Sequence, residues 1–172
     1  ASMGGELFVM DDGWFGDKYP RKNDSSSLGD WVVDKNKLPN GIEGLLSDAK
    51  KHGVKFGIWI EPEMANTTSE LYEKHPDWVL KASERDVVLG RGGTQVVLDL
   101  ANPAVQDFVF GVVDNLMTSY PEIDYIKWDA NMSVQNHGSQ YLTKDNQSHM
   151  YIEFHRGFEK ICQRIRAKYP DL

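Results

Sequence analysis

The sequence predicts an α/β fold in which parallel strands alternate with helices, as in a half-barrel-like part of a TIM (β/α)8 barrel. Four apolar runs are each too short for a buried helix and are typical of buried parallel strands. The alternative, an open doubly wound sheet, is disfavoured as a nucleotide-binding fold because no G-x-G-x-x-G or P-loop sequence follows any run. The expected strands are residues 7–10, 56–60, 96–100 and 125–128.

Four helices are predicted from apolar residues at helical spacing and from residues typical of helix ends. Asn102-Pro103 is a strong N-cap and first-turn pair for the third helix. The fourth carries an apolar stripe that includes His155 and Cys162, so both are predicted to be core residues. The expected helices follow residue 40 and stop before Gly53, run from Ser69 to His75, continue from Pro103 to residue 116, and run from residue 151 to residue 168.

Length and composition restrict the class of protein. The chain has 172 residues, 40% of them hydrophobic, which suffices for the core of one domain. Residues 1–5 resemble an artificial junction. A net charge of −7 disfavours nucleic acid as a partner. No apolar run is long enough to span a membrane, and the single Cys162 suits a reducing, cytoplasmic setting.

Each expected strand runs into a carboxylate. Asp11-Asp12 follow the first strand, Glu61 follows the second, Asp99 lies in the third, and Asp129 follows the fourth. In a barrel these strand ends lie together at the C-terminal face, where catalytic groups are found. The alternative for any one of these acids is a helix N-cap or a loop residue.

Alternation along the fourth strand places several polar residues on one face. With a period of two, Tyr125, Lys127, Asp129 and Asn131 point to the same side. Burying such a row is costly unless the groups pair, so it indicates function, although an edge strand with a solvated polar face would show the same pattern. Lys127 is expected to lower the pKa of Asp129 and keep it ionised, as a nucleophile requires.

Tryptophans next to carboxylates favour a carbohydrate ligand. The chain has five Trp, and several adjoin acidic residues. Aromatic faces cover the C–H face of a sugar, while polar groups hold its hydroxyls. Trp59 shares a face with Glu61, but it could equally be a core residue. The histidines show no metal-binding spacing and Cys162 has no thiol partner, so neither a metal nor a cofactor is expected. The segment from residue 13 to residue 37 is too aromatic for a linker and is predicted to be an ordered active-site loop.

Several motifs, in order along the chain, resemble those of the family 36 glycoside hydrolases, chiefly α-galactosidases. They cover most of the sequence and are Leu7-Phe-Val-Met-Asp-Asp-Gly-Trp-Phe-Gly16, Leu28-Gly-Asp-Trp-Val-Val33, Leu38-Pro-Asn-Gly41, Phe56-Gly-Ile-Trp-Ile-Glu-Pro-Glu-Met64, Glu73-Lys-His-Pro-Asp-Trp78 and Lys127-Trp-Asp-Ala-Asn131.

The resemblance implies that residues 6–172 are the N-terminal part of a (β/α)8 catalytic barrel. It implies a retaining double displacement with Asp129 as nucleophile, acting on terminal α-galactosyl residues of melibiose- or raffinose-type oligosaccharides. It implies that the galactosyl unit is bound by six further residues. These are Asp11 and Asp12 on the hydroxyls, Trp59 packed against the sugar, and Arg91, Lys127 and Asn131 completing the hydrogen bonds. The connection around Arg91 is longer than is usual in the family.

The family's acid/base aspartate follows a Cys-Ser-Gly-Gly-Gly-type segment, and no such segment occurs before Leu172. Retaining hydrolysis uses two carboxyl groups roughly 5 to 5.5 Å apart, so the isolated chain is expected to be inactive or nearly so. Its open sheet edges are expected to make it a homo-oligomer. The alternatives are a galactosyl-transferring relative such as a raffinose or stachyose synthase, an α-glycosidase with another sugar preference, and a non-catalytic folding or self-assembling module.

Overall fold

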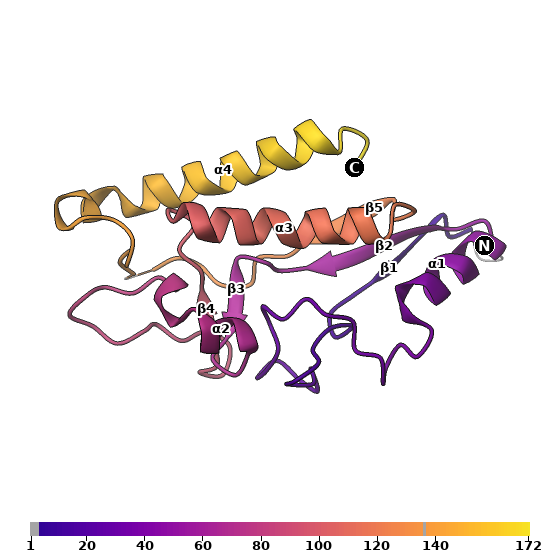
Figure 1. The fold of residues 1–172 in the computed structure, drawn as a ribbon, viewed down its shortest axis with the longest axis horizontal. Coiled ribbons are helices and arrows are strands. Elements are labelled where there is room, and N and C mark those ends of the chain that lie inside the picture. The colour runs from indigo at the N-terminus through magenta and orange to yellow at the C-terminus, as the bar shows by residue number, and fades with distance from the viewer. Residues whose placement is uncertain (1–3, 136) are drawn as a thin grey trace.

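The computed structural model describes residues 4–135 and 137–172, and its centre is a three-stranded parallel sheet (Figure 1). Strand β2 (Lys55–Ile60) lies between β1 (Leu7–Met10) and β5 (Tyr125–Trp128). The register pairs Met10 with Ile58 and Trp59 with Lys127, so the three strands end at nearly the same level. The carboxylates that follow them are therefore brought to one edge of the sheet.

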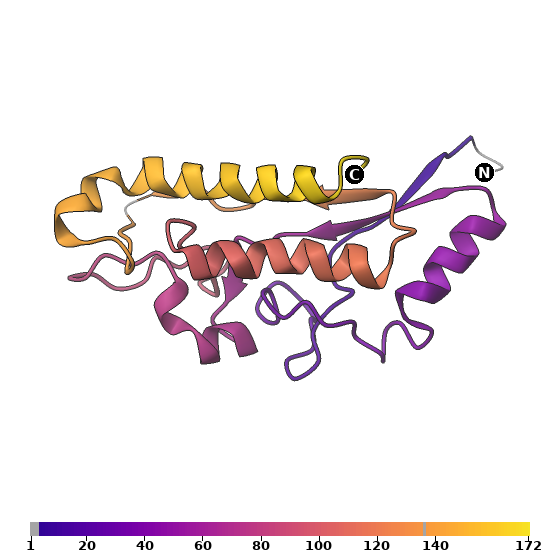
Figure 2. The ribbon, with the colours of Figure 1, turned by 45° about the horizontal axis from the view of Figure 1, so that its top comes forward.

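Helices form the connections between the parallel strands. Helix α1 (Gly41–Lys51) joins β1 to β2, α3 (Pro103–Ser119) precedes β5, and α4 (Met150–Lys168) follows it. Helices α3 and α4 run side by side in both views (Figures 1 and 2). These β-α-β connections confirm the predicted α/β fold with parallel strands. Among residues 4–135 and 137–172, no helix has the length and apolar character needed to cross a bilayer.

The predicted helix starts are built from the expected capping residues. Asn102 Oδ1 accepts a hydrogen bond from Ala104 N at 3.0 Å at the start of α3, and Pro103 lies in the first turn. The short α2 (Glu70–Lys74) begins in the same way, since Ser69 Oγ accepts from Tyr72 N at 3.1 Å. Two 3₁₀ helices, Pro76–Trp78 and Lys144–His149, complete the connections.

The prediction for the third strand is wrong in both extent and partner. Strand β4 covers only Gln95–Val97 and pairs antiparallel with β3 (Met64–Asn66), outside the parallel sheet. Beyond β4, Leu98 forms an antiparallel bridge with Val79, in which Asp99 N donates to Trp78 O at 2.7 Å. An apolar run shows that a segment is buried, but it does not specify which strand lies beside it.

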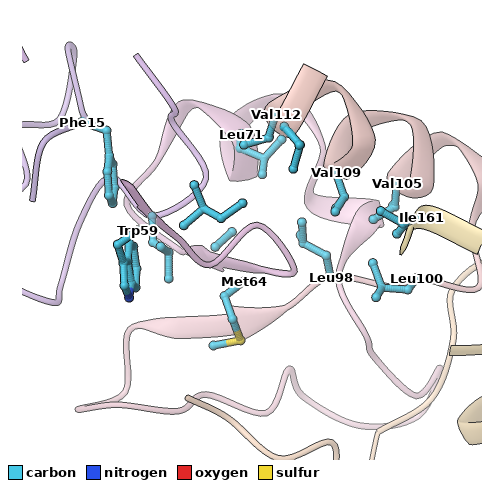
Figure 3. Packing of buried hydrophobic residues seen from close by; sticks show 14 of the residues in the cluster. Phe15, Trp59, Met64, Leu71, Leu98, Leu100, Val105, Val109, Val112 and Ile161 are labelled. Atoms are coloured by element: carbon cyan, nitrogen blue, oxygen red, sulfur yellow. The ribbon is translucent and has the colours of Figure 1, made fainter. Parts of the chain in front are cut away.

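The core joins the sheet, the long loop after β1 and the two long helices (Figure 3). The loop prediction is confirmed in that Trp14 and Phe15 are fully buried. Phe15 stacks on Trp59 at one end of the cluster, with ring centroids 6.1 Å apart. The core prediction for His155 is wrong, since this residue is exposed, and Cys162 is only half-buried. In the described structure no segment covers the side of α4 that carries His155. The buried stripe of α4 is therefore narrower than the spacing of its apolar residues predicted.

Candidate active site

Asp129 lies directly after β5 and is held by neighbours from two strands. Its backbone N donates to Ile60 O at 2.9 Å. Its carboxylate accepts from Trp59 Nε1 at 3.1 Å and from Asn131 Nδ2 at 2.8 Å, both at Oδ2, while Oδ1 accepts from Ala130 N at 3.0 Å. The carboxylate is therefore oriented by three donors.

These donors lower the pKa of Asp129. The largest cause is the side-chain hydrogen bond from Asn131; those from Trp59 and the Ala130 backbone add to it, and so does the positive charge of Lys127. The expected effect of Lys127 is present, but Asn131 contributes more. Partial burial acts in the opposite direction. Asp129 is therefore kept ionised, as an attacking carboxylate must be.

Lys127 and Asp11 form an ion pair across β2. Lys127 Nζ lies 2.9 Å from Asp11 Oδ2, and both side chains are exposed to solvent. The contact lowers the pKa of Asp11 and raises the pKa of Lys127, chiefly through their hydrogen bond. In the described part of the chain β5 is an edge strand, so the polar row on it is partly solvated rather than enclosed in a closed barrel.

Asp12 is bound by an arginine that sequence analysis did not single out. Arg21, which is 3% exposed, donates from Nε to Asp12 Oδ1 at 2.9 Å and from Nη2 to Oδ2 at 2.6 Å. Its Nη1 also donates to Asn66 Oδ1 at 3.1 Å. A cation within the aromatic loop was the signal available in the sequence. This bidentate pair fixes Asp12 beside the site.

Trp59 does not present its ring to the site. The side chain is 2% exposed and lies against Phe15 and Trp31, so little of its face remains for a sugar. Its contact with Asp129 is made through the indole N–H, and the expected packing of Trp59 against galactose stays a prediction. Of the two readings left open by the sequence, the core reading describes its ring.

Two buried glutamates lie beside Asp129. Glu61 is fully buried and its Oε1 accepts from Asn131 N at 2.6 Å. Glu63, which sequence analysis missed, accepts from Trp128 Nε1 at 2.6 Å. Burial raises the pKa of both carboxyls, that of Glu63 to about 8. The E-P-E spacing after β2 was the signal for the second acid.

Two of the predicted residues lie apart from this group. Asp99 is buried under Ser139, whose Oγ donates to Asp99 Oδ2 at 2.5 Å, so its expected place with the other strand-end acids is wrong. Arg91 lies in the loop before β4 and pairs with Asp24 at 3.6 Å. Its charge nevertheless acts on Glu61 and opposes the rise in the pKa of that carboxyl.

Strand-end carboxylates beside a lysine, an asparagine and an indole N–H form a polar cluster at the carboxyl edge of the parallel sheet, where barrel-type α/β proteins place their functional groups. Within residues 4–135 and 137–172, no group of three His, Cys, Asp or Glu side chains is arranged to hold a metal ion. The sequence model of the Melibiase family matches residues 1–172, and the chain belongs to this family.

The relatives named α-galactosidase are about four times longer than the chain. The α-galactosidase AgaA of Geobacillus stearothermophilus is 40% identical over 172 residues, which are 100% of this chain and 23% of AgaA. A probable α-galactosidase C of Aspergillus flavus is 41% identical and is covered over 22% of its length, again by 100% of this chain.

Solved structures show the same fold. The α-galactosidase from Lactobacillus brevis superposes with a TM-score of 0.91 at 40% identity, covering 99% of this chain and 22% of its own. A variant of the AgaA enzyme, described as a GH36 α-galactosidase in complex with raffinose, gives a TM-score of 0.91 at 39% identity over 99% of this chain and 23% of its own. The fold is thus that of one part of the GH36 α-galactosidases.

Proposed function

We propose that this chain carries the nucleophile-bearing part of a retaining α-galactosidase that removes terminal α-galactosyl residues from melibiose- or raffinose-type oligosaccharides. The observation that carries the proposal is the ionised Asp129 carboxylate, oriented by Asn131 and Trp59 at the carboxyl edge of a parallel sheet. Raffinose bound to a structural relative supports the substrate class.

In this reaction one carboxylate oxygen of Asp129 attacks the anomeric carbon. A bond from oxygen to carbon forms, the bond to the leaving oxygen breaks, and a galactosyl ester remains on the protein. Asp11, Asp12, Lys127 and Asn131 are proposed to bind the sugar hydroxyls. Arg91 would join them by exchanging its loose pair with Asp24 for the sugar.

The acid/base group is proposed to lie outside the motifs of this chain, so natural oligosaccharides should react slowly or not at all. An aryl galactoside with a good leaving group needs little protonation and can still form the galactosyl ester. Exposed Leu7, Phe8 and Tyr125 on the two edge strands support a further proposal, that the chain self-associates. The single half-buried Cys162 fits a cytoplasmic setting.

The test is the stereochemistry of the galactosyl azide formed from a dinitrophenyl α-galactoside in the presence of azide. Two displacements restore the starting configuration, so the unmodified chain should give α-galactosyl azide. In Asp129→Ala, azide would occupy the place of the carboxylate and react in one displacement, giving the β product. The same product from both proteins, or no azide-dependent release from either, would contradict the proposal.

A further inference from the structure

Three successive residues at the end of β2 hold the segment that carries Asp129. Trp59 Nε1 donates to the Asp129 carboxylate at 3.1 Å, and Ile60 O accepts from the Asp129 backbone at 2.9 Å. Glu61 Oε1 accepts from Asn131 N at 2.6 Å. Residues 129–135 form no helix or strand, so hydrogen bonds of this kind must define their conformation.

We infer that Glu61 is a positioning residue for the nucleophile: its carboxylate fixes the backbone of Asn131, whose side-chain amide then donates to Asp129. The inference rests on the proposed function only in calling Asp129 the nucleophile. Asn131 Nδ2 lies 2.8 Å from Asp129 Oδ2, so a small displacement of the Asn131 backbone would break the contact.

The burial of Glu61 supports a role of this kind. Its side chain is 0% exposed, and among the described residues Oε2 has no hydrogen-bond partner. A carboxyl group held in this way is costly and is not needed for packing, since an apolar side chain would fill the same volume. Glu61 accepts from the Asn131 backbone N, which is the contact that the inference uses, and hydrogen bonding by the Asn131 side chain also lowers the pKa of Glu61.

Charged groups near Asp129 also affect its pKa. Their effect must be distinguished from that of the hydrogen bond that Asn131 donates. Lys127 on β5 lowers the pKa of Asp129, and Asp11 carries a negative charge nearby. Burial raises the pKa of Glu61 and Glu63, so both are protonated and uncharged where Asp129 titrates. Replacing the carboxyl of Glu61 without changing its hydrogen bond to Asn131 would therefore leave the pKa of Asp129 unchanged. Losing the Asn131 contact would raise the pKa of Asp129, so the two explanations predict different results.

The experiment is a carbon-13 NMR titration of the Asp129 carboxyl in aspartate-labelled chain, with Asp129→Asn used for assignment. Glu61→Met keeps the volume and removes the acceptor, so the pKa of Asp129 should rise by about 0.5 to 1 pH unit, the equivalent of one hydrogen bond. Glu61→Gln keeps an acceptor and should leave the pKa unchanged or lower. Asn131→Ala should raise it as Glu61→Met does.

Asp99→Asn is the matched control, because Asp99 is also a buried carboxyl but contacts Ser139 instead. It should leave the Asp129 titration unchanged. A lower or unchanged pKa in folded Glu61→Met would overturn the inference. If that variant does not fold, hydrogen exchange of the Asn131 amide in the unmodified chain decides, since exchange as fast as in a free peptide would also overturn it.

The titration needs no turnover, so it separates this inference from the proposed function. A raised pKa together with a failed azide test would retain the positioning role and reject the galactosidase assignment. If both hold, Glu61→Met should lower the rate of galactosyl azide formation about tenfold, and Glu61→Gln should restore most of it.

Discussion

At the scale of single residues, the site depends on buried charged groups that meet partners far away in the sequence. Arg21, Glu61 and Glu63 are all buried, and each has a hydrogen-bond partner at the carboxyl edge of the sheet or in the loop beside it. Buried charges are costly unless paired, so changing one of them should affect stability as well as the geometry around Asp129.

Arg21→Met should destabilise the fold by about 3 kcal/mol, because it removes the buried bidentate partner of Asp12 and one of the donors to Asn66. Urea unfolding measures this change in free energy. Arg164→Met is the matched control, since Arg164 pairs with Asp107 at the surface, 2.8 Å away, and its loss should cost less than about 1 kcal/mol. Equal losses in the two variants would contradict the structural role of Arg21.

Glu63 should make stability fall as pH rises. Burial raises its pKa from 4.5 in the unfolded chain to about 8 in the folded protein. The folded state therefore holds a proton that the unfolded state has lost between these values, and stability decreases across that window and levels off above it. The loss is on the order of 5 kcal/mol.

Glu63→Gln keeps an acceptor for Trp128 and removes the titrating group, so its unfolding free energy should change less between pH 5 and pH 8.5. Urea unfolding at the two pH values checks this. An identical pH dependence in both proteins would show that Glu63 is already ionised at low pH.

At the scale of elements, α4 approaches the chain before α3 most closely at a glycine. A Cβ added at Gly157 would lie 1.9 Å from Leu100 O, whereas at Gly111 in α3 nothing lies within 4 Å. The same substitution should therefore have opposite effects in the two helices.

Gly157→Ala should destabilise the chain by about 2 kcal/mol, because α4 must move away from Leu100. Gly111→Ala should stabilise it by about 0.5 to 1 kcal/mol through helix propensity. Thermal unfolding of the two variants tests both. Stabilisation by Gly157→Ala would mean that α4 is not held against this segment in solution.

At the scale of the whole molecule, the parallel sheet has two edge strands, β1 and β5. Phe8 on β1 is 51% exposed, and unpaired strand edges beside apolar side chains favour association. Phe8→Lys should therefore lower the average mass measured by light scattering at micromolar concentration.

Val32→Lys is the control for exposure, because Val32 is 54% exposed but lies in the loop after β1. It should leave the mass unchanged. A mass of one chain for the unmodified protein would contradict self-association, and equal effects of the two lysines would indicate a charge effect rather than a role of the β1 edge.

The sequence by itself determined the α/β pattern, the three strands of the parallel sheet, the capped starts of α2 and α3, and the group around Asp129. These features depend on spacing within a few residues, which a sequence displays directly. The K-W-D-A-N alternation placed Lys127, Asp129 and Asn131 on one side, and in the structure Asn131 donates to Asp129 while the charge of Lys127 lowers the pKa of Asp129.

The tertiary structure alone decided which residues meet across long separations. In the structure Arg21 donates to Asp12, and the ring of Trp59 lies in the core. Asp99 accepts a hydrogen bond from Ser139, and His155 is exposed. The physical reason is that burial and partner choice depend on which elements pack together, and a local pattern of apolar residues is compatible with more than one such packing.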